Sequence, residues 1–316
     1  MRGIRAATVL LTVVMGPSFS AAMAPGGGAS QPVASTVVET RLSLDGIPMG
    51  PLLESTQTQT AAGFEEKFAF LPQVMAPAFY TTWITPTLLG QRPMKTVRLR
   101  GVNHNGGTVS NIEATGIFPQ KIEFPLLDAT RHDPLLIKAS FTTPRFNQIM
   151  TPTLNSPPPT NAQTLRLTTS SFRLQIPGLD ASHVSKIESI SVTPRSANPS
   201  VDPRRPPIST PPNGKDPLSV KTVPPILGPL SISNLVFYLP QASAQPLQQW
   251  LATAPSQTRS GSIDYLSQDM RTVWGTLSLQ GLGITRITTE STPGPYGIYR
   301  TKVEMTIGGV QLAVRP

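Results

Sequence analysis

Proline usage limits the helices that this chain can form. Thirty-five of its 316 residues are proline, roughly twice the usual share of about 5%. Proline lacks the backbone N–H that a helix needs, and its ring clashes with the preceding turn. Long helices are therefore not expected over most of the chain. Because 38% of the residues are apolar and 14% are charged, the chain is also too apolar to be wholly disordered.

The remaining sequence alternates between apolar and polar residues. This period of two occurs at 173–176, 186–192, 276–279, 303–307 and 310–314. Such alternation places apolar side chains on one face of a half-buried antiparallel sheet. Gly308-Gly309 separates the last two segments and predicts a turn or bulge. We therefore expect a mainly β protein.

One segment departs from this period and predicts a helix. In residues 244–251, Pro246 suits a first helical turn, and Leu247, Trp250 and Leu251 share one face. We expect a short amphipathic helix on a sheet. The predicted fold is thus two antiparallel β-sandwich or barrel domains, each with at most one short flanking helix.

The N-terminus has the layout of a secretory signal peptide over residues 1–24. Two arginines precede an apolar run at 6–15, and small residues follow a Gly-Pro break. Cleavage after Ala22 and cleavage after Ala24 both fit, and the alternative is a buried N-terminal helix. The pattern predicts export to the periplasm or the cell exterior. No other segment approaches about 18 apolar residues, so no transmembrane span is expected after signal removal.

Composition divides the rest of the chain. Residues 25–36 are a flexible lead-in rich in glycine, proline and serine, and residues 37–150 form a first compact block. Residues 151–163 contain three consecutive prolines and predict a stiff linker. The second block covers residues 164–316. Its proline-rich stretch 194–229 cannot bury enough apolar surface to fold alone, so it predicts a long exposed loop.

The two blocks begin in the same way. Residues 42–47 and residues 172–180 each form an alternating segment that enters a glycine turn. A polar strand follows in both, at 53–55 and 186–189. This similarity suggests an internal duplication, although no repeat is long enough to prove it from sequence.

Three segments resemble a known family. They are PQKIEFPLLDA (119–129), FRLQIPGLD…VSKIESI (172–190) and LSISNLVFYLPQASAQPLQQWL…GTLSLQGLGITRI (230–287). Together with the Asp-Gly strand opening, they are similar to the tail-tube proteins of contractile phage tails and related injection systems. The resemblance implies small β-sandwich or barrel domains whose copies join sheet edges into six-fold rings around a channel, without catalytic residues.

This chain differs from a simple tube subunit in two respects. Single-domain tube proteins are normally made in the cytoplasm without a signal peptide, whereas this chain has a leader and a tandem arrangement. If both blocks have the tube fold, a trimer would present six quasi-equivalent domains and could match a hexameric ring. The expected partners are therefore further copies of the chain and other tail or envelope components.

Residues typical of active sites are sparse. The absence of cysteine excludes disulfides, thiolate metal sites and cysteine nucleophiles. The three histidines, His104, His132 and His183, are far apart and form no metal-binding motif. His132-Asp133, with Ser140 or Thr142 as a nucleophile, is interpreted as a polar loop before a strand and not as a triad. No nucleophile elbow, P-loop or dinucleotide-binding motif is present.

Other candidates also have structural interpretations. Gly281-Leu282-Gly283 lies between strands and predicts a bend or a close backbone approach, not a phosphate turn. Two carboxylate pairs, Asp128 with Asp133 and Glu65 with Glu66, are attributed to chance proximity. A sugar platform of Trp83, Trp250 and Trp274 is less expected than a core position for Trp250. We therefore predict no enzyme, and no catalytic, metal-binding or cofactor-binding residues.

Charge adds one further expectation. The formal net charge is +9, but the basic residues are scattered and Arg204-Arg205 is the only basic pair. Direct nucleic-acid recognition, which usually needs a concentrated basic face, is not expected. The leading hypothesis is a non-enzymatic structural subunit that assembles through strand edges into rings or tubes. The alternative is an exported β-sandwich module that recognises envelope glycan or a protein partner. An exported hydrolase is a third hypothesis, supported only by unpaired carboxylates and hydroxyls.

Overall fold

A computed structural model describes residues 12–14, 37–61, 63–103, 105–149, 167–194, 229–291 and 299–315. The lead-in 25–36, the linker 151–163, His104 and most of the leader and of the loop 194–229 lie outside these residues. The described chain is mainly β, with antiparallel sheets and few helices, as the alternation predicts.

The described part of residues 37–149 contains ten strands. They are β2 (Glu39–Leu44), β3 (Ile47–Leu52), β4 (Glu54–Thr60), β5 (Gly63–Phe70), β6 (Lys95–Val102), β7 (Thr108–Ile117), β8 (Lys121–Phe124), β9 (Leu127–Asp128), β10 (Ile137–Thr143) and β11 (Asn147–Gln148). A helical segment joins β5 to β6 and consists of η1 (Pro72–Val74), α1 (Pro77–Phe79), η2 (Tyr80–Ile84) and α2 (Thr85–Leu88).

The second half has a similar succession. Its strands are β12 (Phe172–Gln175), β13 (Lys186–Ile187), β14 (Ile190–Pro194), β15 (Leu230–Ile232), β16 (Leu235–Pro240), β17 (Arg259–Leu266), β18 (Val273–Ser291), β19 (Tyr299–Thr306) and β20 (Gly309–Val314). Its helical segment is η3 (Gln241–Ala244) followed by α3 (Gln245–Thr253), which lies where the sequence predicts a helix.

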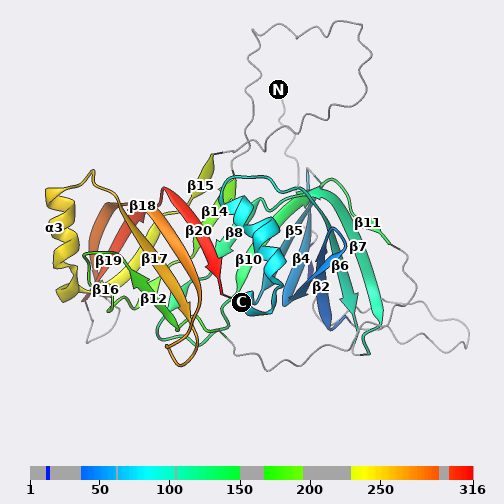
Figure 1. Cartoon of the computed structure of the whole chain (residues 1–316), viewed down its shortest axis with the longest axis horizontal. Helices are drawn as coiled ribbons and strands as arrows, with labels where there is room; N and C mark the ends of the chain where they lie inside the picture. The colour runs from blue at the N-terminus through cyan, green and yellow to red at the C-terminus, as the bar shows by residue number, and fades with distance from the viewer. Residues whose placement is uncertain are drawn as a thin grey trace, which may run out of the picture.

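The two halves share one strand order. In the first half, one layer runs β3-β2-β6-β7-β11 and the other runs β4-β5-β10-β8. In the second half, β12-β17-β18-β20 matches β2-β6-β7-β11. The layer β13-β16-β19-β18 matches β4-β5-β10-β8. The helical segment falls at the same point of both successions, so the pairing supports an internal duplication. We call the described residues of 37–149 the first repeat and those of 167–315 the second repeat; they lie side by side along the long axis (Figure 1).

The long strand β18 belongs to both layers of the second repeat. Its first part pairs with β17 as far as Leu282, and its part from Gly283 onward pairs with β19. Between them, Gly281 has a φ of +64°, and a Cβ there would lie 3.2 Å from the Cα of Gly308. The sequence interpretation of a close backbone approach at this glycine segment is therefore confirmed, but the segment lies within the single strand β18 and not between two strands.

This geometry makes Gly281 sensitive to substitution. We expect Gly281→Ala to destabilise the protein by about 1–2 kcal/mol from the left-handed backbone and by about 1 kcal/mol more from the crowding against Gly308. Gly46→Ala is a matched control, because Gly46 has a φ of +82° but a Cβ added there would have nothing within 4 Å. Urea unfolding of both variants measures the difference, and equal losses would contradict a packing role for Gly281.

The core is one cluster of buried apolar side chains that draws on both repeats. The helical segment of the first repeat contributes Phe79, Trp83 and Ile84, all fully buried. The ring of Trp83 stacks on Phe68, with centroids 6.1 Å apart and an interplanar angle of 4°. The sequence did not predict this segment because its prolines argue against a helix. Pro77 stands at a first helical position, however, where the missing N–H removes no hydrogen bond.

The helices of the described chain are short. None of those in the described ranges is long and apolar enough to cross a membrane.

Candidate assembly interface

The residues considered for a catalytic triad are not brought together. His132 is exposed, and its Nδ1 lies 2.9 Å from the Oγ of Ser170. Asp133 pairs with Arg131 at 3.8 Å. The Thr142 hydroxyl donates to Gln120 Oε1 at 2.6 Å. The histidine and the aspartate thus contact other groups, and the segment forms a polar loop before β10.

The carboxylates of Glu65 and Glu66 face opposite sides of β5. Glu65 forms an ion pair with Lys67 at 3.2 Å, whereas Glu66 is only 1% exposed and lies between the two layers of the first repeat. Adjacent residues on a strand point to opposite faces, so Glu65 and Glu66 cannot act on one substrate. Asp128 accepts hydrogen bonds from Thr130. Over the described ranges, no group of three or more metal-ligating side chains is present.

Glu66 has an unusual environment for a carboxylate. The small cavity beside it is lined by uncharged residues, namely Thr40, Ser55, Gln57, Leu99, Gly101, Ser110 and Ile112. Burial raises the pKa of Glu66 to about 7, and a hydrogen bond from the Ser55 hydroxyl partly opposes this rise. The carboxyl group of Glu66 therefore keeps its proton up to about pH 7 within the sandwich.

A cluster of hydroxyl groups escaped the sequence interpretation. Thr168 Oγ1 lies 3.1 Å from Ser170 Oγ and 3.0 Å from Ser171 Oγ, and Ser170 in turn contacts His132. The Thr169 N–H donates to the Asp133 carbonyl at 2.9 Å. Hydrogen bonds from this cluster connect the loop before β12 to the loop before β10. The run Thr-Thr-Ser-Ser at 168–171 was the available signal, but its partner lies more than thirty residues away in the sequence.

The three tryptophans do not form a sugar platform. Trp83 is fully buried and Trp250 is 3% exposed, as predicted for Trp250. Trp274 is partly buried against the core, and its ring centroid lies 6.4 Å from that of Tyr80. An exposed stacking face would need rings that reach solvent. These side chains instead serve packing.

A strand pairing joins the two repeats. β8 and β9 of the first repeat pair antiparallel with β14 and β13 of the second, in one unshifted register. The opposed apolar pairs are Ile122 with Val192, Phe124 with Ile190, and Leu127 with Ile187. Each of these side chains is at most 2% exposed and contributes about 1.5–3 kcal/mol by burial. We call this pairing the internal joint.

The internal joint changes which strand face is buried. On one strand the buried positions are 122, 124 and then 127, and on the other they are 192, 190 and then 187. The alternation therefore shifts by one residue at Pro125-Leu126 and, directly opposite, at Glu188-Ser189. Pro125 has no N–H to donate to a ladder, which suits it to such an irregularity. Because the buried face changes at the same point on both strands, the ladder directs apolar side chains into the first repeat on one side of this point and into the second repeat on the other side.

The helical segment of the first repeat covers the internal joint. α2 lies against β14 and β20 of the second repeat, and Tyr80 contacts Trp274 on β18. Figure 1 shows this helix in the centre of the molecule, between the two repeats. The joint is thus a strand pairing covered by an uncharged helix, since residues 72–88 contain no Asp, Glu, Lys or Arg.

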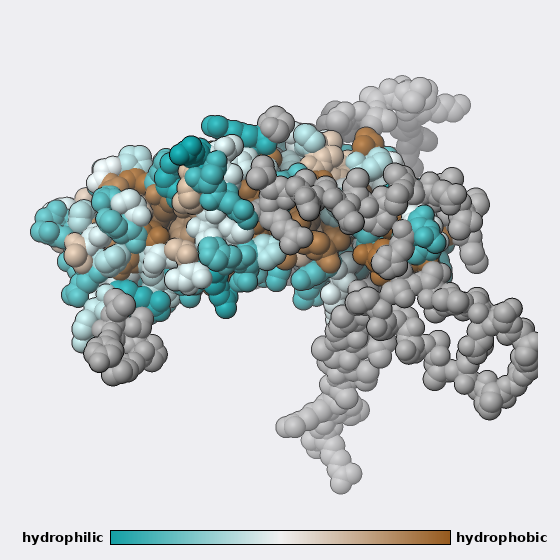
Figure 2. Space-filling model, turned by 90° about the horizontal axis from the view of Figure 1, so that it is seen from below, coloured by the Kyte–Doolittle hydropathy of each residue, from teal (hydrophilic) through white to brown (hydrophobic). Residues whose placement is uncertain are grey.

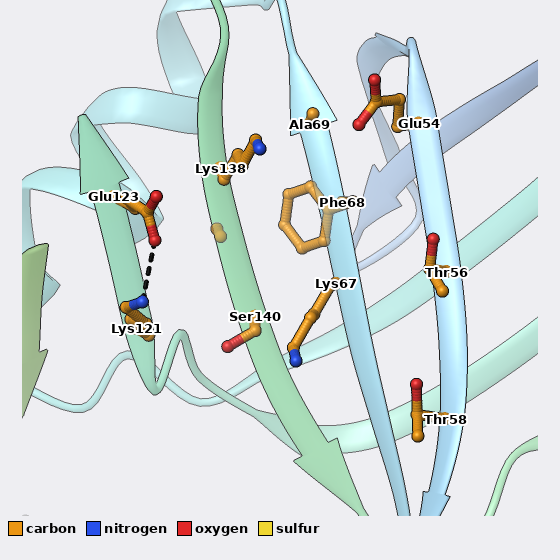
Figure 3. Close-up of a pocket in the computed structure, with 11 residues that line it drawn as sticks. Glu54, Thr56, Thr58, Lys67, Phe68, Ala69, Lys121, Glu123, Lys138 and Ser140 are labelled. Atoms are coloured by element: carbon orange, nitrogen blue, oxygen red, sulfur yellow. Dashed lines mark hydrogen bonds and ion pairs between the residues drawn. The ribbon is translucent and has the colours of Figure 1, made fainter. Parts of the chain in front are cut away.

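The outward face of β4, β5, β10 and β8 carries a polar hollow of about 420 Å³ (Figure 3). Its charged lining residues are Glu54, Lys67, Lys121, Glu123 and Lys138, accompanied by Thr56, Thr58 and Ser140. Lys121 is bound to Glu123 at 2.8 Å. The hollow therefore presents charges of both signs to solvent, beside the hydroxyls of its threonine and serine residues. On the face seen in Figure 2, apolar residues form separate areas among polar ones.

The two sheets that meet at the internal joint each have a long strand edge without a partner in the other repeat. One is the outer edge of β4, and the other is the part of β18 from Gly283 to Ser291, for which β19 is the one partner among the described strands. The β4 edge carries the short strand β1 (Thr12–Val14), in which Val13 lies opposite Gln57. β1 belongs to the segment predicted as a leader. Its pairing indicates that the β4 edge accepts an added strand.

Comparison with known proteins adds no assignment. No family model matches the chain, and no curated protein matches it. The functional interpretation therefore rests on the strand pairings and side chains described above.

Proposed function

We propose that this protein is a non-enzymatic structural subunit that joins copies edge to edge into rings or tubes, as its resemblance to the tail-tube family implies. The observation that carries this proposal is the internal joint. Two repeats with one strand order are already held together by antiparallel pairing of their edges and by burial of apolar side chains from both. A fold that uses its edges once within the chain has the means to use them again between chains.

The proposal includes a location and partners. The leader at 1–24 supports export to the periplasm or the cell exterior, where the mature chain would meet other tail or envelope components. Three chains would supply six repeats, which suits a pseudo-hexameric ring. The alternative function, a module that binds envelope glycan or a protein partner, is supported by the polar hollow in Figure 3.

Light scattering and negative-stain microscopy of the purified mature protein test the assembly function. We expect the mass to rise above that of one chain as concentration increases, and rings or tubes to appear in the micrographs. A trimer mass would support the six-repeat arrangement. A monomer across a wide concentration range, with isolated compact particles, would contradict the proposal and favour the binding module.

A further inference from the structure

We infer that copies of this chain join head to tail, with residues 283–291 of β18 in one copy pairing antiparallel with β4 of the next. In this arrangement α3 of the first copy covers the new joint. The inference rests on the proposed function and names the partner, a second copy, and the surfaces that meet.

The edge strands of the two repeats hold equivalent places. β8 pairs with β10 as the second part of β18 pairs with β19, so these two strands hold equivalent places. β4 pairs with β5 as β13 pairs with β16, so these are equivalent as well. In the internal joint, the edge of β8 and β9 in the first repeat pairs with the edge of β14 and β13 in the second repeat. The equivalent edges that pair with no strand of the other repeat are residues 283–291 of β18 and the outer edge of β4. A contact between two different edges of this type generates rings or filaments.

The strand edges also differ in their amino-acid composition. Solvent-exposed edges are normally blunted by proline, lysine or shortness. β3 contains Pro48 and Pro51, β11 has two residues, and β12 is followed by Pro177. By contrast, β4 reads ESTQTQT and residues 283–291 read GITRITTES, with neither proline nor lysine in either. β20 (GVQLAV) also lacks both residues, but α2 lies against it. We therefore select β4 and residues 283–291 as the edges for pairing between copies.

The helix α3 lies at the free end of the second repeat. α3 lies beside β16, β18 and β19 at the end of the molecule that is distant from the first repeat (Figure 1). Residues 241–254 contain no charged side chain, although Gln245, Gln248, Gln249 and Ala252 are exposed. An exposed helix face normally carries charge, whereas interface cores are depleted of it. The equivalent uncharged segment of the first repeat is the one that covers the internal joint.

The expected contact is weaker than the internal joint. β4 presents Ser55, Gln57 and Gln59 where the internal joint buries isoleucine, valine and phenylalanine, so backbone hydrogen bonds would supply most of its stability. In a chain that retains the leader, the second copy must also displace β1 from the same edge, whereas removal of residues 1–24 removes β1. Both factors predict assembly that depends on concentration.

Cysteine cross-linking of the full chain tests the pairing. The chain has no native cysteine, so Thr58→Cys and Thr288→Cys introduce the only thiols. Thr58 lines the outward hollow, and Thr288 lies opposite Lys302 on the edge strand. With a bismaleimide that spans neighbouring strand positions, the double variant should give a ladder of covalent multimers. Each single variant should give at most a dimer.

A second pair of variants tests the helix. Gln248→Lys with Gln249→Lys adds charge to the exposed face of α3 and should reduce cross-linking and ring formation by at least tenfold. Gln175→Lys, an exposed strand residue away from both edges, is the control and should leave assembly unchanged. Rings without the ladder, and without an effect of the α3 variant, would overturn this inference while the proposed function stands. A monomer at every concentration would overturn both.

Discussion

Phe124→Ala is expected to lower the free energy of unfolding by about 3–5 kcal/mol and to leave a single unfolding transition. Phe124 is 1% exposed and lies opposite Ile190 in the internal joint. Its removal opens a cavity that faces side chains from both repeats. Because one core cluster spans the joint, the two repeats should lose stability together. Urea unfolding followed by circular dichroism and tryptophan fluorescence measures this.

The control for Phe124 is an apolar residue outside the core. Leu53 is 55% exposed, so Leu53→Ala should change the free energy of unfolding by no more than about 0.5 kcal/mol. Two separated transitions in the Phe124→Ala variant, with one of them unchanged from the original protein, would mean that the repeats are energetically independent. The internal joint would then be a contact between two separately stable units.

The stability of the protein is also expected to fall as the pH rises through 7, because of Glu66. Its pKa in the folded chain is raised to about 7 from 4.5. The folded state therefore binds this proton more tightly than the unfolded state does. The resulting stability is fully present below about pH 4.5 and is lost as the pH rises through 7. A shift of this size corresponds to about 3 kcal/mol.

Glu66→Gln should remove this pH dependence and raise the stability at pH 8, since the amide stays uncharged in the sandwich. Unfolding in urea at intervals between pH 5 and pH 8 provides the test. Glu65→Gln, on the outward face of the same strand, should retain the slope of the original protein. An unchanged slope in Glu66→Gln would show that another group is responsible.

Local chemistry made several elements predictable from the sequence. The alternating segments became β12, β18, β19 and β20, and the amphipathic segment became α3. The turn at Asp45-Gly46 is predictable because both residue types tolerate a positive φ. Their φ angles are 49° and 82° in the structure. Gly281 is a similar case, because a glycine between two alternating segments indicates a bend. In each instance the signal lies within a few residues of the element that it predicts.

Other features could not be predicted because they depend on contacts between distant segments. The helical segment of the first repeat was not predicted because its prolines argue against a helix. Its packing against Phe68 and Phe70 shows why a helix forms there. Glu66 is one residue from Glu65, yet only the second layer of the sandwich determines which of them is buried. The hydroxyl cluster at Thr168 likewise depends on a loop far away in the sequence.

From the sequence alone, the prolines thus argued against long helices, and the period of two predicted a mainly β chain and the faces that its strands would bury. The similar openings of the two blocks suggested a duplication. The tertiary structure decided that the repeats share one strand order and that β8 and β9 pair with β14 and β13. The physical reason is that alternation specifies the faces of a strand, whereas hydrogen bonding along its edges is open to any strand that tertiary packing brings alongside.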